Sequence, residues 1–318
     1  GASPVRAARH PGHGFTIGAT IGQKGAAMHT TIDRMPTITD ADVRTYRERG
    51  YWISPKLFSD DQIAATREAI FRLMRGEKDG QSNGWFNLQP IDPAAKNLKQ
   101  WVNAWWVSFG VRRAVLSPVV GYVASRLMQV DGIRLMHDQA IYKPGLGANP
   151  DAEHRDVGNF GWHQDYAYWD YVNTDNLCTV WVALQDTDLS NGAMRTLVGS
   201  HRWGYDPKSK IQTQDLAGFK QRCEAEGKPW IDEPCVLKAG QASFHHALTY
   251  HGSGPNLSDQ PRLSVVSHVM PDGSGYDPSG QWNTVAGLLG PYAKAGDLYG
   301  EPFFPRLWPP MEPGYPGM

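Results

Sequence analysis

The chain has 318 residues, of which 41% are hydrophobic, and its 31 Lys and Arg residues nearly balance its 32 Asp and Glu residues. This length and apolar content predict a soluble globular protein with a substantial core. The balanced charge argues against a partner that needs a basic footprint, so neither nucleic acid nor an anionic membrane surface is expected.

Cysteine content and hydropathy restrict the class further. The three cysteines, Cys178, Cys223 and Cys235, are odd in number and lack a Cys-x-x-Cys pair, which argues against a disulfide framework and a thiolate zinc site. No apolar run approaches the roughly 20 residues that cross a bilayer, and the amino terminus lacks the compact apolar segment of a secretory signal. A cytoplasmic location is therefore predicted, and no protein partner is indicated.

The amino-terminal segment, residues 1–27, is rich in Gly, Ala and basic residues and almost free of acids. We interpret it as a leader, either artificial or from an upstream start, that lies outside the fold. A transit peptide is the alternative, but the segment is Gly-rich with little amphipathic pattern. Residues 28–318 are expected to form a single domain.

Helical patterns dominate residues 39–129. The sequence Ser59-Asp60-Asp61-Gln62 is a capping box ahead of the amphipathic run 63–74, and Ser117-Pro118 marks a second helix start. These helices are expected to form a layer against whatever follows them in the chain.

After Asp131 the pattern changes to short β-branched and aromatic runs between Gly, Pro, Asn and Asp clusters. Such runs occupy residues 133–143, 177–184, 233–237 and 263–270. We predict a mainly β fold, a double-stranded β-helix or jelly-roll barrel, buttressed by the amino-terminal helices. Residues 271–318, dense in Gly, Pro and aromatics, are expected to wrap this core as an ordered coil.

The sequence Trp162-His163-Gln164-Asp165 carries the first metal-ligand signal. Residues two apart in an extended strand project to the same side, so His163 and Asp165 would reach one metal ion. Alone, a His-x-Asp triplet more often reflects a surface loop or a hydrogen-bonded pair.

A third ligand is available in the segment Tyr250-His251-Gly252-Ser253-Gly254-Pro255-Asn256, although His245 and His246 lie close enough in sequence to be alternatives. Two imidazoles and one carboxylate form the facial triad that suits iron(II) and leaves three positions open for a bidentate oxoacid and dioxygen. Arg262, eleven residues after His251, would pair with the distal carboxylate of 2-oxoglutarate.

The chain resembles the phytanoyl-CoA dioxygenase family of iron(II)- and 2-oxoglutarate-dependent oxygenases from about residue 37 to residue 270. The family's order and spacing are matched by Tyr142-Lys143-Pro144-Gly145, Trp162-His163-Gln164-Asp165, Val180-Trp181-Val182-Ala183-Leu184-Gln185-Asp186, Asn191-Gly192-Ala193, Gly199-Ser200-His201 and His251-Gly252-Ser253-Gly254 with Asn256 and Arg262. The resemblance implies metal ligation by His163, Asp165 and His251, in preference to His245 or His246, and anchoring of 2-oxoglutarate by Arg262.

Further pocket residues are expected from strand parity. Ser264 lies two residues after Arg262, and Ser253 lies two residues after His251, so both are expected to assist the 2-oxoglutarate site. Parity also favours Gln139, Thr179 and Trp181 as lining residues, although core packing explains them equally well. His137 shares the parity of Gln139 and is a candidate substrate contact, as are Tyr168 and Trp169 in the aromatic segment after the metal motif. His154, His137 and His268 have no spacing that implicates them in ligation, and His201 is expected to support a loop by hydrogen bonding.

The predicted function is a dioxygenase that uses iron(II), 2-oxoglutarate and O2 to hydroxylate an unactivated C–H bond of a small metabolite or natural-product intermediate, with release of succinate and CO2. Desaturation, epoxidation or ring formation with the same cofactors is the alternative. A jelly-roll binding protein without turnover is the alternative of another class. Because no Lys/Arg cluster near the motifs would suit a CoA pyrophosphate, an uncharged or zwitterionic substrate is favoured.

Overall fold

The computed structural model describes residues 35–79, 88–92, 96–148, 158–210, 216–281 and 283–310. The predicted leader, residues 1–27, lies outside this part of the chain, and so does His154.

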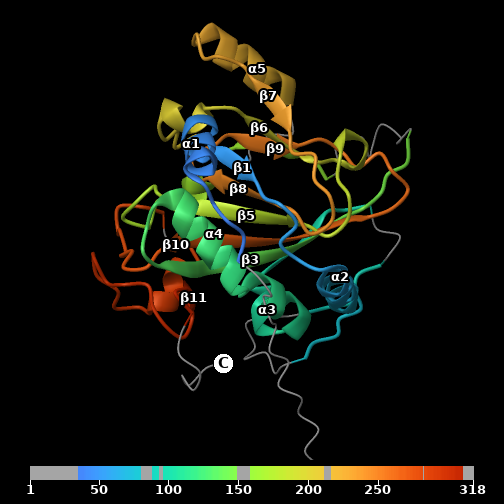
Figure 1. The fold of residues 1–318 in the computed structure, drawn as a ribbon, viewed down its shortest axis with the longest axis horizontal. Helices are drawn as coiled ribbons and strands as arrows, with labels where there is room; N and C mark the ends of the chain where they lie inside the picture. The colour runs from blue at the N-terminus through green and yellow to red at the C-terminus, as the bar shows by residue number, and fades with distance from the viewer. Residues whose placement is uncertain are drawn as a thin grey trace, which may run out of the picture. The chain divides into compact units, whose positions relative to one another are not determined.

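Two antiparallel sheets form the core of the described chain (Figure 1). The larger sheet has the order β1-β8-β5-β10-β3-β11, with β2 also paired to β3. Its strands are β1 (Tyr51–Ile53), β2 (Lys99–Val102), β3 (Ile133–Lys143), β5 (Cys178–Ala183), β8 (Ala242–His246), β10 (Arg262–Pro271) and β11 (Arg306–Trp308). The smaller sheet has the order β4-β9-β6-β7, with strands β4 (Phe160–His163), β6 (Met194–Leu197), β7 (Asp232–Pro234) and β9 (His251–Ser253).

The chain crosses repeatedly from one sheet to the other between β3 and β10. Strands β3, β5, β8 and β10 belong to the larger sheet, whereas β4, β6, β7 and β9 belong to the smaller one. This alternation of antiparallel strands between two facing sheets is that of a jelly roll. The predicted double-stranded β-helix is therefore confirmed, and the expected strand at 133–143 coincides with β3.

Helices cover the outer face of the larger sheet. They are α1 (Asp40–Arg49), α2 (Asp60–Met74), α3 (Phe109–Val115) and α4 (Pro118–Met128), while α5 (Leu216–Ala225) lies near β4. Figure 1 shows α4 lying across β3, β5 and β10, which it contacts. Short 3-10 helices are η1 (Ala104–Trp106), η2 (Asp165–Tyr168), η3 (Leu189–Asn191), η4 (Ser200–Trp203) and η5 (Ala286–Leu289).

The helix boundaries follow the predicted signals. Ser59 and Gln62 form the reciprocal capping box at the start of α2, and Pro118 occupies the first turn of α4. Helix α1 ends at Gly50, whose φ of 80° lies in the left-handed region that glycine adopts without strain.

Two segments differ from the sequence expectation. The region expected to be helical also contributes two strands to the larger sheet, β1, which pairs with β8, and β2, which pairs with β3. The aromatic and β-branched run Tyr51-Trp52-Ile53 favours the extended conformation of β1. The carboxy-terminal coil is packed as expected through Tyr276, Tyr299 and Phe304, but it also supplies β11, and Tyr292 is 89% exposed.

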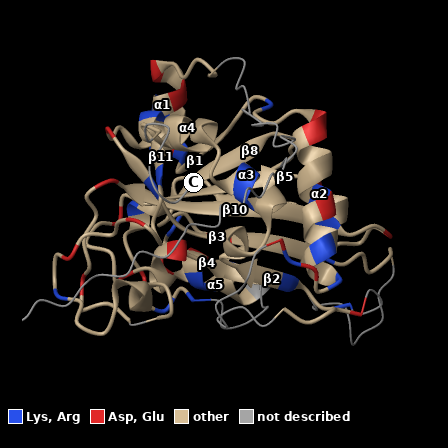
Figure 2. Cartoon of the chain, turned by 90° about the horizontal axis from the view of Figure 1, so that it is seen from below, with Lys and Arg blue, Asp and Glu red and all other residues tan. Residues whose placement is uncertain are grey.

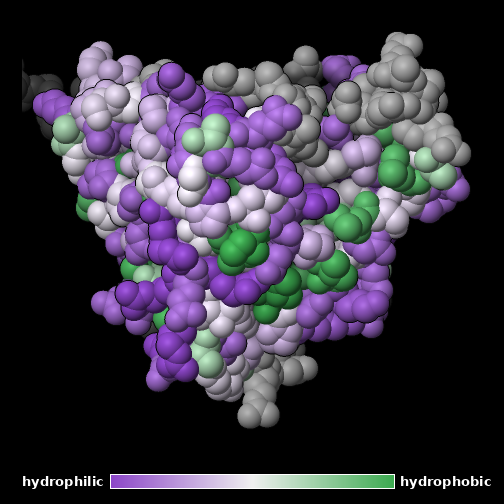
Figure 3. Space-filling model, turned by 90° about the horizontal axis from the view of Figure 1, so that it is seen from above, coloured by the Kyte–Doolittle hydropathy of each residue, from purple (hydrophilic) through white to green (hydrophobic). Residues whose placement is uncertain are grey.

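No helix in the described ranges is both long and apolar enough to cross a bilayer. On the face drawn in Figure 3, the hydrophobic residues of the described chain form only small groups among hydrophilic ones.

Asp138 on β3 is a buried carboxyl group at the contact between the larger sheet and η1. Its Oδ1 accepts a hydrogen bond from the Trp105 N–H at 3.2 Å, whereas Oδ2 is buried with no partner in the described chain. Burial raises the pKa of Asp138 to about 8. Between the ordinary carboxyl pKa of about 4 and pH 8, the unfolded chain releases a proton that the folded chain keeps, so stability is lost as pH rises.

The asparagine of the Asp138→Asn variant cannot ionise, so the variant should not lose stability in this way as the pH rises. We expect the free energy of unfolding of the variant, relative to wild type, to increase between about pH 5 and pH 8 and then to level. Urea unfolding at a series of pH values measures it. A difference that does not change with pH would show that Asp138 is ionised in the folded protein.

Candidate metal centre

A cavity of about 400 Å³ lies between the two sheets. The inward-facing residues of β3, β5 and β10 form one wall, and β4 and β9 form the other. The sequence-predicted residues that line it are His137, Gln139, His163, Asp165, Tyr168, Trp169, Thr179, Trp181, His251, Ser253 and Arg262. The jelly roll thus gathers into one cavity residues that are far apart in the sequence.

His163, Asp165 and His251 meet at one side of this cavity. Their ligand atoms all lie within 4.8 Å of one another, and Nε2 of each histidine is 3.6 Å from Asp165 Oδ1. The histidines face each other because His163 ends β4, His251 begins β9 and the two are paired in register. Asp165 starts η2 instead of continuing the strand, but the extended backbone of Gln164 keeps it on the side of His163.

Hydrogen bonds to the backbone fix the tautomers of both histidines. His163 Nδ1 is 2.8 Å from the Gly161 carbonyl oxygen, and His251 Nδ1 is 2.9 Å from that of Thr249. A carbonyl oxygen only accepts, so Nδ1 carries the proton in each ring. Each Nε2 therefore presents a lone pair to the shared centre, which is the arrangement of a metal-ligating histidine with an outer hydrogen bond.

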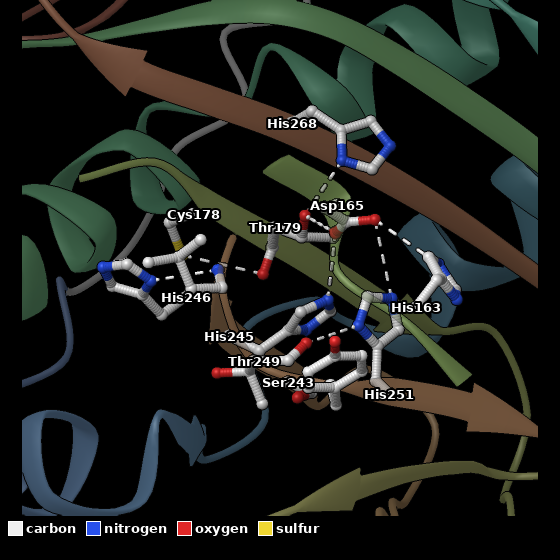
Figure 4. A network of polar contacts seen from close by, with 12 residues as sticks. His163, Asp165, Cys178, Thr179, Ser243, His245, His246, Thr249, His251 and His268 are labelled. Carbon is white, nitrogen blue, oxygen red and sulfur yellow. Dashed lines mark hydrogen bonds and ion pairs between the residues drawn. The ribbon is translucent and has the colours of Figure 1, made fainter. Parts of the chain in front are cut away.

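The second oxygen of Asp165 is held from the other side. Thr179 Oγ1 donates a hydrogen bond to Asp165 Oδ2 at 2.5 Å, and His245 Nε2 lies 3.4 Å from the same oxygen (Figure 4). Thr179 was expected to contact the cofactor. Its hydroxyl proton is instead donated to the carboxylate of Asp165. The two oxygens have different partners, so the orientation of the carboxylate is fixed.

The alternative histidines are placed differently. His245 is fully buried beside Asp165, and its ring lies 4.5 Å from that of His251, but it is outside the group whose ligand atoms converge. His246 Nδ1 accepts a hydrogen bond from the Leu248 N–H at 3.1 Å. His201 Nε2 is hydrogen-bonded to the Arg47 carbonyl oxygen in the last turn of α1, at 3.0 Å, and so connects its own segment to that helix.

A buried guanidinium lies at another part of the cavity. Arg262 is 2% exposed and donates to the Gly192 carbonyl oxygen at 2.7 Å, while its Nε is buried without a partner in the described chain. It forms no ion pair with a described carboxylate. Burial lowers the pKa of Arg262 to about 10, which leaves it charged at neutral pH. A buried cation without a counter-ion predicts an anionic ligand.

Lys143, absent from the predicted site, lies beside this guanidinium. The two residues are register partners on β3 and β10, and Lys143 Nζ donates to Ser253 Oγ at 2.8 Å and to the Gly254 carbonyl oxygen. Burial, with the charge of Arg262, lowers the pKa of Lys143 well below its usual range. The motif that contains Lys143 was visible in the sequence, but only the pairing of β3 with β10 brings its side chain here.

Comparison with known proteins identifies the family to which the chain belongs. The sequence model of the phytanoyl-CoA dioxygenase (PhyH) family matches residues 46–264, more than half of the chain. The chain belongs to the phytanoyl-CoA dioxygenase family. It is therefore an iron- and 2-oxoglutarate-dependent dioxygenase that acts on a small molecule.

Three similar proteins share about a quarter of their aligned residues with this chain. A probable alpha-ketoglutarate-dependent hypophosphite dioxygenase from Stutzerimonas stutzeri is 25% identical over 233 residues, covering 72% of this chain and 78% of its own. The ectoine dioxygenase of Streptomyces avermitilis is 26% identical over 254 residues, covering 74% and 79%. The crystal structure of the epimerase SnoN with Fe³⁺, alpha ketoglutarate and nogalamycin RO is 25% identical, with a TM-score of 0.63 over 84% of this chain and 97% of that one.

The remaining predicted residues of this dioxygenase fall into two groups. Gln139 and Trp181 line the cavity, and the Arg262 guanidinium lies 5.1 Å from the Trp181 ring centroid. Ser264 is on the same strand face as Arg262 and fully buried, and its hydroxyl has no partner in the described chain, but it is not among the lining residues of the cavity.

Aromatic and imidazole rings form the part of the cavity away from Arg262. Trp169 lies against His137 and His268, with ring separations of 5.7 and 4.6 Å. Burial lowers the pKa of His137 to about 4. Sequence reasoning missed residues 283–285 here, because nothing in their pattern shows that the carboxy-terminal coil returns to the cavity.

Electrostatics at the triad favour a cation. Burial works to raise the pKa of Asp165, but the facing imidazoles of His251, His163 and His245 outweigh it and hold that pKa well below the usual range. Burial and neighbouring His163 lower the pKa of His251 to about 3. Asp165 is thus a carboxylate, and His251 is neutral, at physiological pH.

The three cysteines take no part in this centre. All are buried and unpaired, and burial raises the pKa of Cys178 and of Cys235 to about 12. They are therefore thiols, not thiolate ligands, at physiological pH.

Proposed function

We propose that His163, Asp165 and His251 hold the iron, that Arg262 anchors 2-oxoglutarate, and that the enzyme hydroxylates an unactivated C–H bond of a small metabolite or natural-product intermediate. One observation carries this proposal. Three converging ligands of the facial-triad type share a single cavity with a buried guanidinium that has no carboxylate partner among the described residues.

The donor set fits iron(II). Two imidazoles and one carboxylate form the facial set of non-haem iron oxygenases, which leaves positions for a bidentate oxoacid and dioxygen. The outer contacts of all three ligands are already in place, through Gly161, Thr249 and Thr179. Such contacts orient ligands before the metal arrives.

The proposed 2-oxoglutarate site begins at Arg262. A guanidinium binds a carboxylate bidentately, and the buried Arg262 gives this end of the cavity its positive charge. Ser253, oriented by Lys143, adds a hydroxyl. Gly192 leaves room for the side chain of Lys143, because a Cβ at position 192 would lie 3.1 Å from Lys143 Nζ. The φ of Gly192 is +73°, in the left-handed region that favours glycine.

When bound, the metal and 2-oxoglutarate supply the activation of dioxygen, with release of succinate and CO2 and oxidation of the substrate. The protein binds and orients both organic molecules. It also excludes water from them, since the ligands and Arg262 are all buried between the sheets.

The cavity favours an uncharged or zwitterionic substrate. Within the described lining, Arg262 is the one permanent cation and Asp165 the one carboxylate. Figure 2 shows basic and acidic residues interspersed along the described chain.

Other outcomes of the same chemistry are desaturation, epoxidation and ring formation. One relative, SnoN, is an epimerase and was crystallised with Fe³⁺ and alpha ketoglutarate, so a different fate of the oxidised substrate is compatible with this fold. The alternative of another class is a jelly-roll binding protein that lacks turnover.

Oxygen-dependent formation of succinate from 2-oxoglutarate separates the enzyme from the binding protein. We expect the iron-loaded protein to form succinate slowly in air and faster when a screened compound is a substrate. Samples under nitrogen and samples stripped of metal are the controls. An iron-loaded protein that forms no succinate in air with any compound of the screen would favour the binding protein.

A further inference from the structure

His268 lies on β10, six residues after Arg262 and on the same strand face. It is the register partner of both His137 on β3 and Thr179 on β5, so three neighbouring strands bring these side chains together. His268 lines the cavity and is 4% exposed. At roughly 3.3 Å per residue, it stands about 20 Å along the strand from Arg262, at the opposite end of the cavity wall.

The hydrogen bonds of Thr179 determine which ring nitrogen of His268 carries the proton. The carboxylate of Asp165 only accepts, so the 2.5 Å contact with Thr179 uses the single hydroxyl proton of Thr179. His268 Nδ1 lies 3.0 Å from the same Thr179 Oγ1. Because that oxygen has no second proton to give, Nδ1 must carry the proton and donate it.

The opposite nitrogen of His268 is consequently an acceptor. The pKa of His268 lies well below its usual range, because the side chain is buried and His137 is close, so the ring is neutral. With the proton on Nδ1, Nε2 holds a bare lone pair. Nε2 is buried without a partner in the described chain, and Figure 4 shows it turned away from Thr179. A buried acceptor without a donor costs stability until a donor arrives.

The surroundings of Nε2 show what kind of donor fits. The ring of His137 lies 4.3 Å from that of His268, and the ring of Trp169 lies 4.6 Å from it. Asn283 and Thr284 line the cavity as uncharged polar residues. The described lining places no second carboxylate in the cavity to hold a cationic group, and its permanent cation, Arg262, lies at the other end of β10.

We propose that His268 is a substrate-recognition residue whose Nε2 accepts a hydrogen bond from a neutral substrate that bears a hydroxyl or amide N–H next to apolar or aromatic surface. This inference rests on the proposed function, since it assumes that Arg262 takes the co-substrate. The relay from His268 through Thr179 to Asp165 also makes Thr179 a positioning residue, which holds both the recognition imidazole and the ligand carboxylate.

The first test determines the tautomer of His268. In the full chain loaded with zinc in place of iron, and with ring-¹⁵N histidine, we expect His268 to show a protonated Nδ1 and an unprotonated Nε2. His268→Asn identifies the signal. Thr179→Val should allow the proton to redistribute between the two nitrogens, whereas Thr179→Ser should preserve the wild-type pattern. A protonated Nε2 in the wild type would overturn the proposal.

The second test uses a matched pair of neutral probes, cyclohexanol and cyclohexanone, which share a skeleton but differ in the hydroxyl donor. We expect cyclohexanol to shift the Nε2 signal and to bind about two- to tenfold more tightly than cyclohexanone. His268→Asn keeps a donor near Thr179 but removes the Nε2 acceptor, and should abolish this preference. His268→Gln places an amide oxygen near the Nε2 position and should restore part of it.

Equal binding of the two probes to the wild type, a preference unchanged in His268→Asn, or no effect of cyclohexanol on Nε2 would each overturn the recognition role. His268→Asn must still bind zinc and 2-oxoglutarate like wild type, which shows that it is folded. If wild type fails to bind 2-oxoglutarate while the tautomer is as expected, the proposed function fails and the assignment of the acceptor stands.

Discussion

Asp165→Gly is expected to weaken metal binding by more than about 100-fold, because loss of a direct ligand should exceed the 10- to 100-fold effect of losing an outer contact. The substitution removes the one anionic ligand and leaves only the imidazoles of His163 and His251. Titration of the metal-free protein with cobalt(II), followed by its visible absorption, measures the affinity without requiring turnover.

Two variants control this experiment. Asp131→Gly makes the same substitution at an exposed aspartate and should bind cobalt(II) like wild type. Thr179→Val removes the 2.5 Å hydrogen bond to Asp165 together with the contact to His268, leaves all three ligands in place, and should cost about tenfold in metal affinity. Wild-type affinity in a folded Asp165→Gly protein would show that the carboxylate is not a ligand.

Arg262→Leu is expected to weaken 2-oxoglutarate binding by about ten- to a hundredfold while leaving metal affinity nearly unchanged. The guanidinium is buried in the cavity and has no carboxylate partner in the described chain, so its loss leaves the distal carboxylate of 2-oxoglutarate without its main partner. Isothermal titration of the zinc-loaded protein with 2-oxoglutarate measures the effect.

Arg195→Leu is the matched control. Arg195 pairs with Asp232 on the smaller sheet and does not line the cavity, so this variant should bind 2-oxoglutarate normally. If Arg262→Leu weakens metal and 2-oxoglutarate binding to the same extent, Arg262 supports the fold and does not anchor the co-substrate.

Much of the fold was predictable because its signals are local. The capping box at Ser59, the Pro118 helix start and the mainly apolar run of β3 each depend on a few neighbouring residues. The convergence of His163, Asp165 and His251 was predictable for a different reason. The two-residue period of extended backbone relates the first pair, and the family resemblance selects the third.

What the sequence did not predict depends on pairing between distant strands. Lys143 lies beside Arg262 because β3 pairs with β10, and it reaches Ser253 on β9 because the two sheets face each other. His268 meets Thr179 because β10 also pairs with β5. His245 was weighed only as a ligand, since the sequence does not show that it lies behind the carboxylate of Asp165. These contacts depend on which distant strands pair, and the residues of one strand do not show which strand is its partner.

Anaerobic addition of 2-oxoglutarate to the iron(II)-loaded wild-type protein tests the central claim most directly. Because the triad leaves adjacent positions free, chelation of the oxoacid should produce its weak visible charge-transfer band, saturating at one equivalent of 2-oxoglutarate per iron. Arg262→Leu should need a higher 2-oxoglutarate concentration to give the same band. A wild-type sample that demonstrably holds iron(II) at His163, Asp165 and His251 and shows no band would contradict the account.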